Sequence, residues 1–262
     1  MFLNFTFRYK HLKNKNLFKF EPKKELWFVV MNYLAIVLMF YLSFQIITIQ
    51  HVAAQFITFG VLGVLILGIL TPAIYNTLIK KRPLSEIGIH QKKLVYSLGL
   101  CLVFTVIQYF LTLRNVELPS FTSILPLIFM VITVGYFENI FFRGYAQNRF
   151  EESFGIIPAI LLSTIIYTLY HVGYGMLGSE YGMLFIVGLT YSIIFRITKN
   201  IFILFPLLTP MGALYTNIKE ELSIPLEAII GFSMVIVCAT LCLIYIHIIW
   251  KKKINKTSNA VL

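Results

Sequence analysis

The sequence contains no aspartate, and only 13% of its 262 residues are charged. A soluble domain of this size carries about 25% charged residues. The absence of aspartate excludes any mechanism that needs a pair of aspartates. Cysteine is also scarce, and its three positions, Cys101, Cys238 and Cys242, all lie in apolar segments. They are predicted to be free, buried thiols rather than a metal site or a disulfide.

Long apolar runs take the place of the missing charge, because 58% of the residues are hydrophobic. Most of these runs are long enough to cross about 30 Å of hydrocarbon as a helix. The sequence therefore predicts an all-α polytopic membrane bundle with about eight transmembrane helices. The predicted segments are 26–49, 53–79, 94–113, 121–142, 156–175, 183–198, 201–217 and 225–250.

The basic residues predict the orientation of these segments. With the N-terminus in the cytoplasm and eight alternating crossings, 20 of the 22 lysines and arginines fall on the cytoplasmic side, and Arg114 and Lys219 remain outside. Such asymmetry is typical of cytoplasmic loops. We therefore predict a plasma-membrane protein with both termini cytoplasmic. Its predicted parts are a basic tail (1–25), a single transmembrane domain (26–250) and a second basic tail (251–262).

Glu138 is a carboxylate inside an apolar segment, at the end of the run from Phe121 to Phe137. A charge in the bilayer core costs roughly 2.5–3.5 kcal/mol on insertion scales, so such a residue indicates function. Among the five histidines, His171 lies inside an apolar segment with polar neighbours, whereas His11, His51 and His90 lie in tails or loops. For His247, near the end of the last segment, a role at the membrane interface is favoured.

Glu138 and His171 are predicted to face each other. The two segments that carry them are antiparallel, and the turn near Gly155 lies midway between them in the sequence. Positions equidistant from a helical hairpin turn lie at the same height, about 16 Å from Arg149 at 1.5 Å per residue. A buried Glu–His pair suits a general base that activates water. A structural polar pair and a proton relay are the alternatives that the residues leave open.

Other hydrolytic mechanisms lack their motifs. The sequence has no His-Glu-x-x-His, so the ligands of a zincin-type metalloprotease are missing. It also has no Gly-x-Ser-x-Gly, so a serine nucleophile elbow is not indicated.

The stretch from Glu138 to Tyr145, Glu-Asn-Ile-Phe-Phe-Arg-Gly-Tyr, resembles the first motif of the CPBP family (CAAX proteases and bacteriocin-processing enzymes, also called Abi proteins). That motif reads Glu-Glu-x-x-x-Arg, often followed by Gly-Tyr. The family's second motif, an aromatic residue four positions before a histidine, is similar to Tyr167 through His171. The resemblance covers about residues 120–217 and implies a multi-span intramembrane peptidase.

The resemblance also implies roles for individual residues. Glu138 would be the general base and His171 its partner, while Arg143 would pair with a helix end or an acid on the cytoplasmic side. Tyr167 would be the aromatic residue of the second motif. The family is thought of as glutamic-type and was historically classed with the metalloproteases. No metal ligand set is visible in the sequence, so no cofactor is predicted.

The sequence departs from the family at two places. Asn139 replaces the second glutamate of the first motif. The third motif, His-x-x-x-Asn or His-x-x-x-Asp, is thought to stabilise the oxyanion, and the span from Asn200 to Gly212 contains no histidine. Thr209 lies ten positions beyond Lys199, at the predicted depth of Glu138. Its hydroxyl would either donate to an oxyanion or bond its own backbone.

Three functions remain open on this basis. The first is an intramembrane endopeptidase that cleaves a peptide or lipidated protein, for example a bacteriocin-like one, at the membrane. The second is a catalytically impaired relative that acts as a membrane scaffold or bacteriocin-immunity protein. The third is a proton-coupled transporter, which would be expected to carry an internal inverted repeat that the sequence does not show. The partners expected are the lipid bilayer and a peptide, with no nucleic acid.

Overall fold

The computed structural model describes residues 16–47, 51–90, 94–176 and 178–259. Every regular element in these ranges is helical, which confirms the predicted fold class. The elements are α1 (Glu25–Tyr41), η2 (Leu42–Ile46), α2 (Val52–Phe56), η3 (Ile57–Leu70), α3 (Thr71–Ile74), η4 (Tyr75–Ile79), η5 (Leu84–Ile87), α4 (Leu94–Thr112), α5 (Phe121–Glu138), η7 (Asn139–Gln147), α6 (Asn148–Phe154), α7 (Ile156–Tyr170), η8 (His171–Tyr174), η9 (Gly178–Glu180), α8 (Tyr181–Thr198), η10 (Ile201–Ile203), α9 (Leu208–Lys219) and α10 (Ala228–Asn259).

Seven helices in the described part of the chain are long and apolar enough to cross a membrane. Several of them combine successive elements, so that α5, η7 and α6 form one span from Phe121 to Phe154. That span continues twelve residues beyond the predicted segment 121–142, because Arg143 and the polar residues after it are buried rather than exposed. The chain is therefore a multi-pass membrane protein.

The predicted span 201–217 is not one helix, so the described residues hold seven such helices rather than eight. Lys199 ends α8 in the left-handed conformation (φ 50°), and Asn200 caps η10 by accepting from the Phe202 amide. The helix α9 begins only at Leu208 and has 12 residues, or about 18 Å at 1.5 Å per residue, too short for the hydrocarbon layer. Pro206 precedes it and lacks the N–H that a continuous helix needs.

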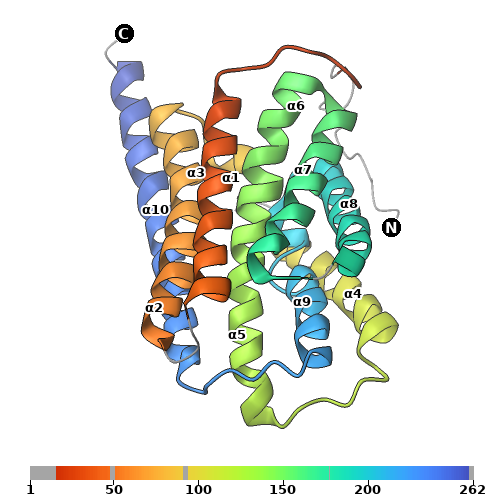
Figure 1. Cartoon of the computed structure of the whole chain (residues 1–262). Helices are drawn as coiled ribbons and strands as arrows, with labels where there is room; N and C mark the ends of the chain where they lie inside the picture. Colours follow the sequence, from red (N-terminus) through yellow and green to blue (C-terminus); the bar gives the residue numbers. More distant parts are fainter. Residues whose placement is uncertain (1–15, 48–50, 91–93, 177, 260–262) are drawn as a thin grey trace, which may run out of the picture.

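Figure 1 shows where the ends of the elements lie. The start of α1, the turn between α6 and α7 and the end of α10 lie together at the top of the view, and the α4–α5 and α9–α10 connections lie at the bottom. Of the two basic residues expected outside, Arg114 belongs to the α4–α5 connection and Lys219 is the last residue of α9, directly before the α9–α10 connection. The start of α1 and the end of α10 lie at the same end of the bundle, which requires an even number of crossings. The number is even when the interrupted segment formed by η10 and α9 counts as a crossing beside the seven long helices. The cytoplasmic placement of the upper end stays a prediction.

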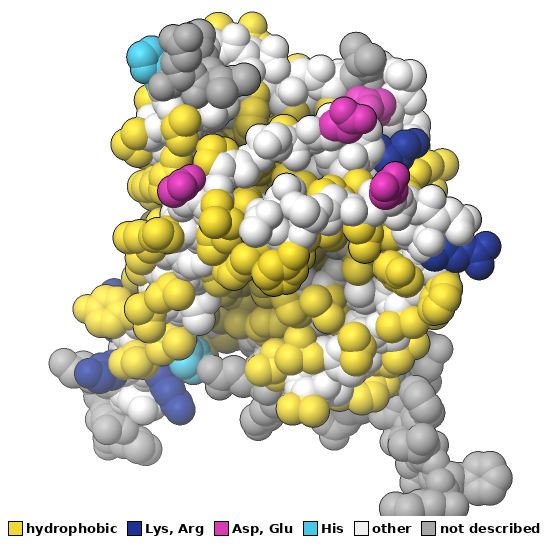
Figure 2. Space-filling view, turned by 90° about the horizontal axis from the view of Figure 1, so that it is seen from below, with side chains coloured by type: hydrophobic (Ala, Val, Ile, Leu, Met, Phe, Trp, Pro, Cys, Tyr) yellow, Lys and Arg dark blue, Asp and Glu magenta, His cyan; other side chains and the backbone are white. Residues whose placement is uncertain are grey.

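The exposed surface is strongly apolar. Side chains such as Val95 (86% exposed) and Leu111 (79%) on α4 have no protein cover. The face seen from below is also mostly hydrophobic, with a few acidic and basic side chains (Figure 2). The apolar surfaces along the sides of the helices, such as that of α4, are expected to face lipid. The same exposure corrects one prediction: the cysteines are free, but only Cys101 is buried, because Cys238 faces outward and Cys242 is half-buried.

An ion cluster joins distant segments at the upper end of the bundle. The buried Arg149 of α6 contacts three carboxylates, those of Glu25 (3.1 Å), Glu152 (3.0 Å) and Glu86. Arg82 also contacts each of these carboxylates, at 3.1–3.5 Å. The cluster therefore ties α1, η5 and α6 together.

Two glycines allow the close packing around the span that carries Glu138. Gly155 has φ +89° and makes the turn between α6 and α7 at the predicted place. Left-handed backbone of this kind favours glycine. Gly144 lies against the carbonyl of Ile87, which a Cβ at this position would overlap. The short helix η5 can therefore pack directly against η7.

Candidate active site

Glu138 is the last residue of α5 and is 6% exposed. The phenolic O–H of Tyr170, at the end of α7, donates to Oε1 of Glu138. Tyr170 is itself fully buried. A carboxylate buried among apolar residues needs such a donor, because an unpaired one is costly. The hairpin α5–α7 thus supplies both the carboxylate and a hydrogen bond that fixes one of its oxygens.

His171 follows Tyr170 directly and is also 6% exposed. Its Nδ1 lies 2.9 Å from the carbonyl oxygen of Tyr167. Because a carbonyl only accepts, Nδ1 carries the hydrogen, and in the neutral ring Nε2 is left with a free lone pair. The four-residue spacing of the second motif allows this hydrogen bond, because residues i and i+4 lie on one face of a helix.

Glu138 and His171 are connected through an intermediate residue, and among the described residues no direct hydrogen bond or ion pair joins the two. Their predicted face-to-face pairing stays a prediction. The hydrogen bond to Glu138 comes from Tyr170, whose ring packs against His171 with centroids 4.2 Å apart. Sequence reasoning missed Tyr170. The signal that points to it is its place beside His171, also at the depth of Glu138.

Arg143 lies one turn beyond Glu138 on η7 and is 1% exposed. Its guanidinium stacks over the Tyr167 ring at 4.3 Å, in the range of a cation–π contact. Within the described residues it forms no salt bridge, and its Nη1 is buried without a hydrogen-bond partner. The first and second motifs are therefore joined through Arg143 and Tyr167, a contact that the motif spacing alone does not reveal.

Asn139 and Thr209 form the other side of the site. The Asn139 side-chain amide donates to the Gly135 carbonyl (2.7 Å) and to the Thr209 hydroxyl oxygen (3.1 Å). Thr209 is 4% exposed and lies in the first turn of α9. Thr209 thus contacts the residue next to Glu138 although its segment is not a straight helix. The hydroxyl keeps its own hydrogen for donation.

The donor set does not match a catalytic zinc site. Such a site takes three protein ligands, and Glu138 and His171 supply two. In the described ranges no group of three or more His, Cys, Asp or Glu side chains is placed to hold a metal ion.

The fold and the site together define a multi-pass membrane protein with buried acid and imidazole groups at one depth. Comparison with known families agrees with this class. Residues 120–209 match the family described as type II CAAX prenyl endopeptidase Rce1-like, which confirms the resemblance to the CPBP intramembrane proteases. Over these residues the chain is similar to CAAX-type intramembrane proteases, and the match supports that class at the family level. The matched range includes both motifs and ends at Thr209. No curated protein and no solved structure matches the chain.

Proposed function

We propose that the protein is an intramembrane endopeptidase in which Glu138 activates water for attack on a peptide bond. The observation that carries the proposal is the buried Glu138 carboxylate, held by Tyr170 beside a histidine whose Nε2 is free to accept. Two acceptors then face one water molecule, and each can take one of its two hydrogens. This arrangement is typical of general-base hydrolysis.

In the first step the water oxygen bonds to the carbonyl carbon of the scissile peptide, and its proton passes to Glu138. His171 Nε2 accepts the second hydrogen of the water as a hydrogen bond and orients the attack. The carbonyl π electrons move to oxygen and give a tetrahedral oxyanion. The Thr209 hydroxyl donates to that oxygen, with Asn139 fixing its position.

In the second step the carbon–nitrogen bond breaks. The proton held by Glu138 passes to the leaving nitrogen, and the oxyanion electrons re-form the carbonyl. The products are a carboxylic acid and an amine, and Glu138 returns to its ionised form. Every proton that moves comes from the attacking water, so no other reagent is consumed.

The matched family supports a peptide substrate. We propose a peptide or lipidated protein of the prenylated CAAX type, cleaved at the plasma membrane, where both chain termini are cytoplasmic. A bacteriocin-like peptide is the other substrate to test. The decisive experiment incubates the purified chain in liposomes with a farnesylated CAAX peptide and follows release of the C-terminal tripeptide by mass spectrometry. Absence of cleavage for both peptides would contradict the proposal.

One observation favours a second candidate, a catalytically impaired membrane scaffold or immunity protein. The span from Asn200 to Gly212 has no histidine, and Thr209 stands at the depth of Glu138 instead. A protein that protects cells in a bacteriocin-immunity assay but cleaves neither peptide would have this function.

The Tyr170→Phe variant is expected to cleave on the order of tenfold more slowly, with little change in KM. The substitution removes a hydrogen bond to a carboxylate, which contributes about 1.5–3 kcal/mol, but keeps the aromatic ring in place. The effect appears in kcat because Tyr170 positions the base rather than the substrate. Tyr245→Phe, at a tyrosine that is 65% exposed, is the matched control. Equal kcat for both variants would remove Tyr170 from the site.

Replacing Thr209 with valine is expected to lower kcat about tenfold or more. Valine keeps the shape of threonine but removes the donor to the oxyanion. A hydrogen bond to a charged group contributes about 1.5–3 kcal/mol, so about tenfold is the lower end of the expected loss. Steady-state kinetics with the same peptide measure the change. Thr190→Val removes a hydroxyl that bonds only within its own helix, to Ile186 at 2.9 Å, and should leave the rate unchanged. Unchanged turnover of Thr209→Val would exclude its role at the oxyanion.

A further inference from the structure

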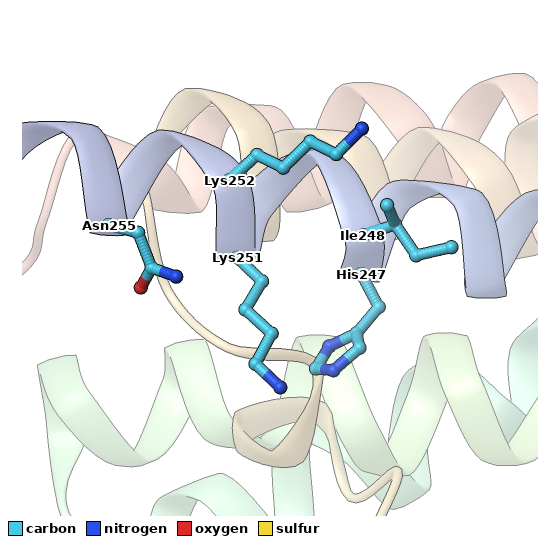
Figure 3. Close-up of a pocket in the computed structure, with 5 residues that line it drawn as sticks. All are labelled: His247, Ile248, Lys251, Lys252 and Asn255. Atoms are coloured by element: carbon cyan, nitrogen blue, oxygen red, sulfur yellow. The ribbon is translucent and has the colours of Figure 1, made fainter.

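A pocket of ≈ 440 Å³ lies on the C-terminal part of α10, away from Glu138. Its lining residues are His247, Ile248, Lys251, Lys252 and Asn255. Figure 3 shows that His247 and Lys251 project from the same side of α10 toward each other, while Lys252 projects from a different side. His247, Lys251 and Asn255 lie on one face of α10 because they are four residues apart in the sequence.

The pocket lies where the apolar part of α10 ends. From Ala228 to Trp250 the helix contains no charged residue apart from the titratable His247, and three lysines follow directly. The His247 and Trp250 rings stack with centroids 5.8 Å apart. Aromatic rings followed by lysines are typical of the boundary between hydrocarbon and headgroups. The pocket is therefore placed at the level of lipid phosphates.

A second segment holds this part of α10 in place. The Trp250 indole N–H donates to the carbonyl of Lys81, at 3.0 Å. This bond joins α10 to the loop after η4 and brings the backbone of a further lysine, Lys81, to the same level. Lys251 and Lys252 are exposed, and in the part of the chain that the structure describes neither forms an ion pair with a carboxylate. Their charges are thus available for an anionic ligand.

We propose that this pocket binds the headgroup phosphate of an anionic phospholipid. Lys251, His247 and Asn255 supply hydrogen-bond donors for phosphate oxygens, and Lys252 adds charge from the adjacent face. Ile248, which is 45% exposed, offers an apolar wall beside them for the start of an acyl chain. The volume is within the range of small-ligand sites, about 300–1,000 Å³. This site is independent of the proposed proteolysis.

The test measures binding of phosphatidylglycerol to the full purified chain by native mass spectrometry, against a phosphatidylcholine background. The Lys251→Gln/Lys252→Gln variant is expected to bind phosphatidylglycerol about 25-fold more weakly, roughly fivefold for each lysine charge near an anionic headgroup. Lys24→Gln/Lys219→Gln removes two exposed lysines elsewhere and should keep the preference. Size-exclusion chromatography and the thermal midpoint check that each variant is folded.

Each remaining outcome overturns the proposal. Equal loss in the control variant would mean that only overall charge attracts the lipid. An unchanged preference in the Lys251→Gln/Lys252→Gln variant would mean that the lipid binds elsewhere. A further arm adds inorganic phosphate alone. If it displaces phosphatidylglycerol at concentrations comparable to the lipid, the site takes free phosphate rather than a lipid.

Discussion

Replacing Glu138 with glutamine is expected to lower kcat/KM for peptide cleavage by about 10²–10⁴-fold, the usual contribution of a general base. Glutamine has nearly the same volume, and its amide oxygen can still accept from Tyr170. The fold is therefore retained, while the side chain can no longer take a proton from water. The farnesylated-peptide assay in liposomes measures the change.

Glu227→Gln is the matched control, because it makes the same substitution at an exposed glutamate outside the site. Its activity should equal that of the unaltered protein. His171→Ala is expected to lose activity in the same assay, since the water then lacks its second acceptor. If Glu138→Gln and His171→Ala both cleave at the full rate while present at normal abundance, general-base catalysis by this site is wrong.

Replacing Arg149 with methionine is expected to lower the free energy of unfolding by about 3–5 kcal/mol, as when one partner of a buried ion pair is removed. Arg149 is 1% exposed and contacts the carboxylates of Glu25, Glu86 and Glu152. Without its guanidinium these acids lie close together, and Arg82 is the cation left in contact with each of them. Methionine keeps much of the side-chain volume, so the loss reports charge rather than a cavity.

Unfolding in mixed detergent micelles, with increasing sodium dodecyl sulfate, measures this free energy. Arg114→Met, at an exposed arginine at the opposite end of the bundle, should change it by less than about 0.5 kcal/mol. A loss below about 1 kcal/mol for Arg149→Met would show that the cluster contributes no more than a surface ion pair.

Hydropathy and turn signals predict most of the fold. The first segment, predicted at 26–49, is observed as Glu25–Ile46, and the third, predicted at 94–113, as Leu94–Thr112. The antiparallel pairing of the Glu138 and His171 segments also follows from the sequence, because Gly155 marks the turn. These predictions succeed because the length of an apolar run and a left-handed glycine are local properties.

The interrupted crossing shows what hydropathy cannot predict. Residues 201–217 are apolar enough for a span, and an average over the window does not register that Pro206 and the left-handed Lys199 break the helix. Charge counting has a similar limit at Arg149. It treats every basic residue as a solvated charge on one side of the membrane, whereas the structure buries Arg149 among acids from three segments of the chain.

In the candidate site, the sequence predicts the residues that belong to motifs but not the contacts between them. Tyr170 is one of 15 tyrosines, and its place beside His171 indicates its depth but not its bond to Glu138. Its bond to Glu138 depends on how α5 and α7 rotate about their axes, which is set by packing across the whole bundle. The stacking of Arg143 on Tyr167 depends on the same rotation.

The interruption between η10 and α9 also bears on how a hydrolase obtains water inside a bilayer. Non-helical backbone is tolerated at membrane depth where protein groups or water form hydrogen bonds with its N–H and C=O groups. Protein groups cover part of this segment here, since the Leu208 carbonyl accepts from the Tyr191 hydroxyl at 3.3 Å and the Tyr136 ring stacks on Phe205. Thr209 follows directly. The break thus places backbone N–H and C=O groups without helical partners next to the proposed reaction centre. Such groups can bind the water molecule that hydrolysis consumes and keep it within the protein, away from lipid.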